Sequence, residues 1–133
     1  MSKPIIAPSL LSANFLNLRE DLEKINSSDA DWLHVDIMDG VFVPNISFGF
    51  PVLKQMADLT KKPLDVHLMI VQPEKFIKEI KDLNTMMMNV HYETCTHLHR
   101  VTPDQIALPI FPAACTACRS QYKFFYRNDA KHA

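Results

Sequence analysis

The fold is decided by two short stretches of sequence, WLHVDIM at residues 32–38 and LDVHLMI at residues 64–70. Apolar residues occupy every second position in both, and the side chains of a β-strand point alternately to its two faces. In the first stretch Leu33, Val35 and Ile37 therefore share one face, and the second stretch repeats the pattern. Each stretch is predicted to form a strand with an apolar face under helices and a polar face opposite it.

The polar faces of these two strands carry the residues that suggest chemistry. They are His34, Asp36 and Met38 in the first strand and Asp65, His67 and Met69 in the second. Inside a barrel of parallel strands such faces converge, with catalytic groups at the carboxyl ends of the strands. A buried carboxylate such as Asp36 needs a cation or hydrogen-bond donors. His34, Asp36 and His67 suit a divalent metal ion, and the alternative is that the histidines are hydrogen-bonded core residues.

Amphipathic stretches separate the apolar runs and complete a strand–helix repeat. The other apolar runs are residues 5–7 and 86–91, and helical spacing of apolar residues occurs at 15–25, 51–59 and 73–83, the last two opened by Pro51 and Pro73. Four strands alternating with three helices predict an α/β fold with parallel strands. This is about half of a (β/α)8 TIM barrel, since a whole barrel needs about 200 residues or more. A compact open α/β sheet is the other architecture that the repeat allows, and the convergent polar faces favour the barrel.

Residues 101–133 follow a different pattern. Prolines interrupt the first third of this segment, and no strand–helix unit continues the repeat. We therefore expect a boundary near Arg100. Residues 1–100 would form the N-terminal half of the barrel, and residues 101–133 would form an irregular tail outside the fold.

Composition excludes several classes of protein. The chain has 133 residues, of which 47% are hydrophobic and 22% charged, and its net charge is −1. This balance predicts one globular domain with no basic footprint for nucleic acid or an anionic membrane. The sequence has no apolar run of the roughly 18 residues that a membrane span needs and no signal-peptide core at its start, so a cytoplasmic location is expected. Three cysteines do not suit a disulfide framework, and two glycines exclude a glycine-rich phosphate loop within this chain.

A longer stretch around the first strand carries a resemblance to a known family. The run LHVDIMDGVFVPNISFG at residues 33–49 resembles the signature of the ribulose-phosphate 3-epimerases. The segments IAPSLLSA at 6–13, LDVHLM at 64–69 and NVHYE at 89–93 match the same family in order, over about residues 3–100. The family fold is a (β/α)8 barrel, which agrees with the strand pattern.

The resemblance implies a metal-dependent epimerase. His34, Asp36 and His67 would bind one catalytic divalent metal ion, with Fe²⁺, Zn²⁺, Co²⁺ and Mn²⁺ as candidates. The family interconverts D-ribulose 5-phosphate and D-xylulose 5-phosphate in the pentose phosphate pathway, by removing the proton next to the ketone and returning one from the opposite face. Asp36 would be one of the two acid/base carboxylates, and the metal would stabilise the enediolate formed between the two steps.

The resemblance also implies roles for residues around the reacting carbon. Ser9 would contact the sugar phosphate, and His67 would contact it as well as the metal. Met38 and Met69 would belong to a methionine cluster that lines the reaction zone, although methionines on such faces also serve to fill a core. Family members form oligomers, so pairing between copies of the chain is a further expectation, whereas nucleic acid and membrane partners are not expected.

The resemblance ends near Arg100. The family's second acid/base aspartate, which is also its fourth metal ligand, and its glycine-rich phosphate grip lie in the later half of the barrel, and Asp104 and Asp129 fall in no matching motif. A truncated or altered C-terminal half is the expected explanation, with little epimerisation by the isolated chain. Two alternatives stay open. One is an epimerase for another ketose phosphate, and the other is a non-catalytic fragment that binds metal or pairs with complete subunits.

Overall fold

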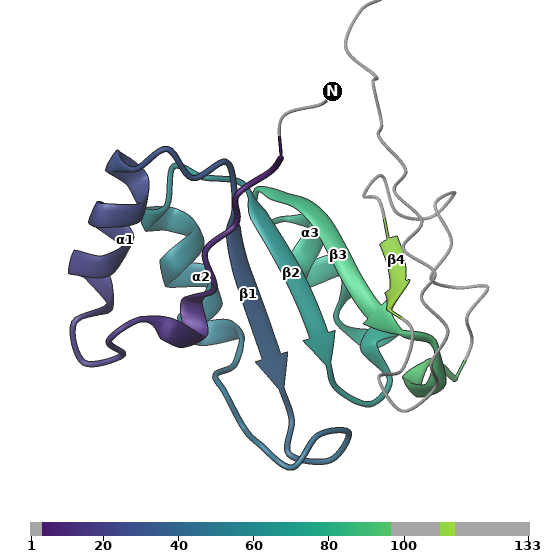
Figure 1. Ribbon diagram of the computed structural model, residues 1–133. Coiled ribbons are helices and arrows are strands. Elements are labelled where there is room, and N and C mark those ends of the chain that lie inside the picture. Colours follow the sequence, from purple (N-terminus) through teal and green to yellow (C-terminus); the bar gives the residue numbers. More distant parts are fainter. Residues whose placement is uncertain (1–3, 97–109, 114–133) are drawn as a thin grey trace, which may run out of the picture.

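The computed structural model describes residues 4–96 and the backbone of residues 110–113. These form a four-stranded sheet in which all neighbouring strands are parallel (Figure 1). The strands are, in both chain order and spatial order, β1 (Leu33–Met38), β2 (Leu64–Met69), β3 (Thr85–His91) and β4 (Ile110–Ala113). A parallel sheet whose spatial order follows the chain, with helices between its strands, is the arrangement of part of a (β/α)8 barrel, so the predicted fold class is confirmed.

Within residues 4–96, three α-helices connect or precede the strands. They are α1 (Leu18–Ser27), α2 (Phe50–Leu59) and α3 (Ile77–Lys81), and the short 3-10 helices are η1 (Leu10–Ser12), η2 (Pro73–Lys75) and η3 (Tyr92–Thr94). Pro51 lies in the first turn of α2, where a backbone N–H has no acceptor within the helix, so proline loses no hydrogen bond there. The predicted helix over residues 73–83 is divided into two, because Phe76 leaves helical geometry with φ −110° and ψ 1° between η2 and α3.

The core lies between the sheet and these helices. The apolar faces of β1 and β2 are buried as predicted, since Leu33, Val35, Val66 and Leu68 are all 0% exposed and Ile37 is 4% exposed. The helices complete the same cluster with Leu22, Leu53, Met56, Ile77 and Ile80. Removal of this apolar surface from water holds the helices on one face of the sheet, and the polar face is left for other residues.

The run at residues 5–7 is not a regular strand, so that part of the sequence prediction is wrong. It lies along the free edge of β1, where Pro8 accepts a hydrogen bond from the backbone N–H of His34 at 2.9 Å. Ile6 donates its own N–H to a carboxylate side chain, and Pro8 has no N–H to donate. The ladder is therefore reduced to an isolated parallel bridge between Ser9 and His34.

Strand β4 also departs from the sequence prediction, because it falls within the segment 101–133 that was expected to be irregular. It pairs in parallel with β3, in a register that runs from Met88 opposite Ile110 to His91 opposite Ala113. The expected boundary near Arg100 lies outside the described residues, as does the rest of that segment.

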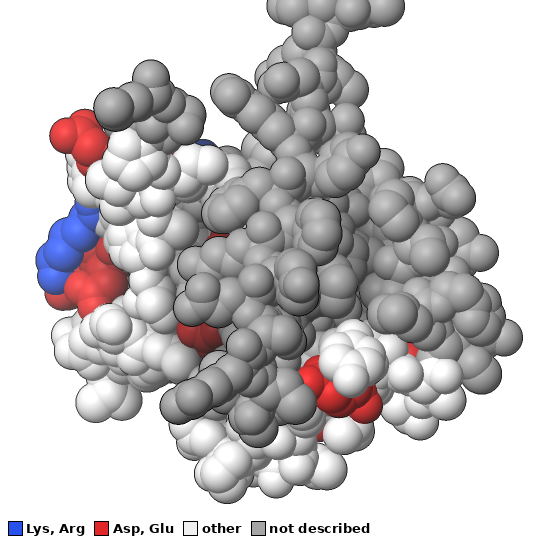
Figure 2. Space-filling model, turned by 45° about the vertical axis from the view of Figure 1, so that its right-hand side comes forward, with Lys and Arg blue, Asp and Glu red and all other residues white. Residues whose placement is uncertain are grey.

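On the face shown in Figure 2, acidic side chains are visible at several places. In the view of Figure 2 the basic side chains gather at one edge, beside acidic ones. Within residues 4–96 and 110–113, no helix has both the length and the apolar character needed to cross a bilayer.

Gly40 shapes the loop that follows β1, and its replacement by alanine is expected to destabilise the fold by about 1–3 kcal/mol. Its φ is +75°, and an added Cβ would lie 2.8 Å from Cγ1 of Ile46. Chemical denaturation measures the loss. Gly49→Ala is the matched control, because its Cβ would lie at an ordinary 3.7 Å from Cδ of Pro51. Equal stability of the two variants would contradict the argument.

Candidate metal centre

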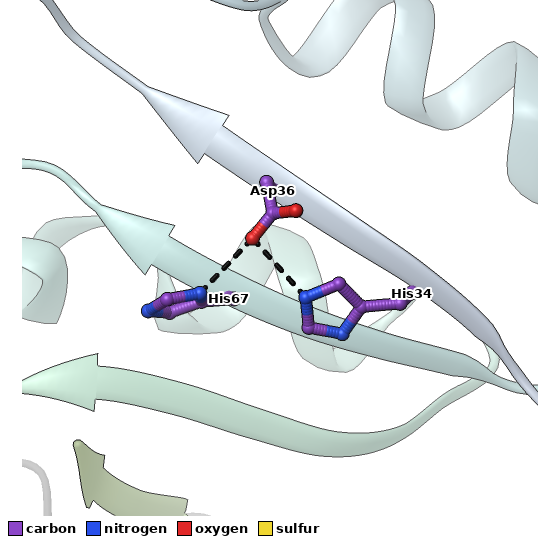
Figure 3. Close-up of side chains that lie close together, drawn as sticks. All are labelled: His34, Asp36 and His67. Carbon is purple, nitrogen blue, oxygen red and sulfur yellow. Dashed lines mark hydrogen bonds and ion pairs between the residues drawn. The ribbon is translucent and has the colours of Figure 1, made fainter. Parts of the chain in front are cut away.

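Three polar side chains converge on the polar face of the sheet, opposite the helices. His34 and Asp36 come from β1, and His67 comes from the residue of β2 that stands opposite Asp36 in the register. Oδ1 of Asp36 lies 3.1 Å from Nε2 of His34 and 3.0 Å from Nδ1 of His67 (Figure 3). The structure therefore brings together the three residues that strand alternation had placed on one face.

The cluster has a strong electrostatic character, because Asp36 is only 9% exposed. Burial raises the pKa of Asp36, but the hydrogen bonds from His34 and His67 outweigh it and hold this pKa well below its usual range. In turn, the hydrogen bonds that His34 donates to Asp36 and Asp65 raise the pKa of His34 to about 10, against the opposing effect of burial. At neutral pH the metal-free cluster thus holds a carboxylate beside an imidazolium.

The donor set fits a divalent metal ion. One ligand atom each of His34, Asp36 and His67 can be chosen so that all three lie within 4.8 Å of one another. Imidazole nitrogen and carboxylate oxygen are ligands that Zn²⁺ and Fe²⁺ accept, and ligands that bind one ion at about 2.0–2.2 Å lie about 3–4 Å apart. The separations of 3.0 and 3.1 Å around Oδ1 of Asp36 already have this value, so a cation can replace the protons that these residues share.

Ser9 adjoins the cluster from the segment beside β1. Its Oγ donates to Oδ2 of Asp36 at 3.3 Å and accepts the backbone N–H of Leu11 at 3.3 Å, which caps η1. The two oxygens of Asp36 therefore have different neighbours, with histidines at Oδ1 and a hydroxyl at Oδ2. The structure places Ser9 next to the residue expected to move the substrate proton.

Met38 and Met69 stand at the carboxyl ends of β1 and β2, opposite one another in the register. Both are half-buried. Each lies two residues beyond a cluster residue, Asp36 or His67, and so shares its strand face. Met38 also lines a pocket of about 470 Å³ together with Phe48. Their expected contact with a reaction zone stays a prediction.

The loop after β1 is held by side chains rather than by regular pairing. Asp39 accepts the backbone N–H groups of Val41 and Phe42 through Oδ1, and that of Val71 through Oδ2. Ser47 donates to the backbone oxygen of Asp36 at 2.9 Å. Asp39 is therefore a turn-forming residue, and it ties the loop after β1 to the loop after β2.

Sequence reasoning assigned no role to two side chains that contact the cluster, Asp65 and His91, or to Asn89, which contacts Asp65. Oδ2 of Asp65 lies 2.7 Å from Nδ1 of His34, Nδ2 of Asn89 donates to Oδ1 of Asp65 at 2.9 Å, and Nε2 of His91 lies 2.9 Å from Nε2 of His67. Alternation along β3 sets Asn89 and His91 on the face opposite the buried Met88 and Val90. The same period of two could therefore have identified them.

Comparisons with known proteins agree with this geometry. The model of the "Ribulose-phosphate 3 epimerase family" matches residues 5–107, so the matched range continues beyond Arg100. The chain is 48% identical over 103 residues to the ribulose-phosphate 3-epimerase of Synechocystis sp., which is 75% of this chain and 45% of that protein.

Two further relatives give the same result. The ribulose-phosphate 3-epimerase of Bacillus subtilis is 42% identical over 95 residues, covering 71% of this chain and 44% of that protein. The chloroplastic ribulose-5-phosphate-3-epimerase of Arabidopsis thaliana is 45% identical over 104 residues, covering 77% of this chain and 37% of that protein. The chain thus spans less than half the length of these curated relatives.

Proposed function

The chain belongs to the ribulose-phosphate 3-epimerase family, and from this premise we propose that it acts in the metal-dependent interconversion of D-ribulose 5-phosphate and D-xylulose 5-phosphate. The observation that carries the proposal is the meeting of His34, Asp36 and His67 at one carboxylate oxygen on the polar face of the sheet. Since the chain spans less than half of its relatives, reaction, substrate and partners are proposals for this chain.

Each residue has a stated part in this proposal. Asp36 is ionised at neutral pH and is the carboxylate that takes the proton from the carbon next to the ketone, or returns it. His34, Asp36 and His67 hold the cation, which when bound supplies Lewis-acid stabilisation of the developing negative charge on oxygen. Ser9 and His67 contact the sugar phosphate.

Met38 and Met69 complete the proposed site by lining it. Thioether side chains offer bulk without charge, so they limit the access of water to the reacting carbon while leaving the electrostatic field to Asp36. Pairing of copies of the chain and a cytoplasmic compartment also belong to the proposal, and sedimentation analysis with cell fractionation tests them.

Proton exchange at the reacting carbon tests the proposal directly. The 133-residue chain, loaded with Zn²⁺ or Co²⁺, is incubated with D-ribulose 5-phosphate in heavy water, and NMR follows deuterium at the carbon next to the ketone. Exchange is expected for this substrate and absent without metal. Faster exchange of a six-carbon ketose phosphate would favour the other epimerase, and zinc binding without any exchange would favour the non-catalytic fragment.

Zinc binding is expected to release about one proton from His34 near pH 8. The pKa of His34 is raised to about 10 in the metal-free protein, so Nε2 is protonated at that pH and must lose its proton to bind. Apparent affinity should therefore rise by about tenfold per pH unit until about pH 10, whereas a histidine with an ordinary pKa of about 6.5 would release almost none. Calorimetry in buffers of different ionisation enthalpy counts the protons, and equal heats in all buffers would contradict this expectation.

A further inference from the structure

We propose that Asp65, oriented by Asn89, is a positioning residue that keeps a proton on Nδ1 of His34 and so leaves Nε2 of His34 to face Asp36 and His67 as a ligand. The inference rests on the metal site of the proposed function. It concerns residues on which the sequence resemblance placed no role.

The contact between Asp65 and His34 is the tightest that His34 makes. Oδ2 of Asp65 lies 2.7 Å from Nδ1 of His34, against 3.1 Å between Nε2 of His34 and Asp36. The two residues stand opposite one another in the register of β1 and β2, so the backbone fixes their approach. Asp65 is only 7% exposed, so its contacts are made largely away from solvent.

Hydrogen-bond chemistry assigns the proton. An ionised carboxylate only accepts, so a ring nitrogen in contact with it must carry the hydrogen. A neutral imidazole has one N–H, and if Asp65 accepts it from Nδ1, the lone pair of His34 is on Nε2. A carboxylate behind a ligating histidine also raises the basicity of the ligating nitrogen and fixes the plane of the ring.

Asn89 determines which oxygen of Asp65 faces His34. Its amide Nδ2 donates to Oδ1 of Asp65 at 2.9 Å, while Oδ2 faces His34. Both oxygens of the carboxylate are thus engaged, one on each side. If position 65 carried an amide, its orientation would be fixed, because the Nδ2 donor of Asn89 needs an oxygen opposite it.

Asp65→Asn is therefore expected to reverse the tautomer of His34 rather than merely remove a charge. The new carbonyl oxygen pairs with Asn89, and the new NH₂ group faces Nδ1 of His34, which then must accept. Nδ1 then carries no proton, and the one proton of the neutral ring is on Nε2, where it blocks the ligand position. Calorimetry with Zn²⁺ alone is expected to show an affinity about 10- to 100-fold weaker than that of the wild-type chain.

The double variant Asp65→Asn with Asn89→Asp, called the exchanged pair, tests whether the reversed arrangement restores zinc binding. A carboxylate at position 89 accepts from the new amide, which turns its carbonyl oxygen toward His34 and restores the proton on Nδ1. Zinc affinity is expected to return to within about tenfold of the wild type. Glu74→Gln is the control, since it makes the same change at a carboxylate that accepts the backbone N–H of Thr96 instead, and it should leave zinc affinity unchanged.

Nitrogen NMR of the histidine rings gives a readout that does not need the metal. A slowly exchanging Nδ1–H signal of His34 is expected in the wild type and the exchanged pair, and is expected to be lost in Asp65→Asn. Wild-type zinc affinity in Asp65→Asn, or no recovery in a folded exchanged pair, would overturn the role of Asp65. A wild-type chain that binds no zinc would instead overturn the proposed metal site, and the Nδ1–H signal would still decide the role of Asp65.

Discussion

Asp36→Asn is expected to slow deuterium exchange next to the ketone of D-ribulose 5-phosphate by about 10²- to 10⁴-fold, the usual cost of losing a general acid or base. The asparagine keeps the shape of the side chain but cannot take up a proton at neutral pH. It also removes the negative charge at which His34 and His67 meet. NMR in heavy water with saturating Co²⁺ measures the exchange rate while limiting the contribution of weaker metal binding.

A matched carboxylate separates chemistry from folding in this experiment. Asp58→Asn makes the same substitution at an exposed position of α2, away from the polar face of the sheet, and should leave the exchange rate unchanged. A folded Asp36→Asn chain that still exchanges at the wild-type rate would mean that another group moves the proton. Net epimerisation by the wild-type chain would show that a second acid acts on the opposite face.

The parallel sheet could be predicted because the side-chain pattern of two segments is typical of β-strands. Alternation in residues 32–38 and 64–70 separates apolar from polar positions, and burial of Val35 and Val66 at 0% exposure follows from it. The same alternation brings Asp36 and His67 to one face, after which the parallel register sets them opposite one another. The meeting of His34, Asp36 and His67 could thus be predicted, because the alternation of side chains and the strand register are sufficient to bring them together.

The features that the sequence did not predict depend on contacts that do not recur at a regular spacing along the chain. Residues 5–7 look like a strand by composition, but Pro8 cannot donate and Ile6 donates to a side chain, so the ladder stays incomplete. A four-residue strand such as β4 is too short for its alternation to stand out among prolines. The role proposed for Asp65 depends on which of its oxygens accepts the hydrogen bond of Asn89, and only the three-dimensional structure shows this contact.

His34→Ala and His67→Ala are each expected to weaken zinc binding by more than about 100-fold. A loss of about 10- to 100-fold is typical when the substituted residue only forms a hydrogen bond to a metal ligand. The reason is that each removes a nitrogen that lies 3.0 or 3.1 Å from Oδ1 of Asp36. Calorimetry with Zn²⁺ near pH 8 measures the affinities. Thr85→Ala is the control, because Thr85 is buried in β3 and bonds the backbone oxygens of Ile80 and Leu83, so its loss lowers stability without touching the cluster.

The double variant distinguishes one shared ion from two independent sites. If His34 and His67 hold the same ion, each single change already disables most of the site, and the double change should cost less than the product of the two single effects. If the histidines bound separate ions, each single variant would keep one site with wild-type affinity, and only the double variant would lose both. Weakened binding is expected in both single variants, so unchanged affinity and stoichiometry in both would remove these histidines from the site. A single variant that loses one bound zinc ion and keeps another at wild-type affinity would contradict a shared ion.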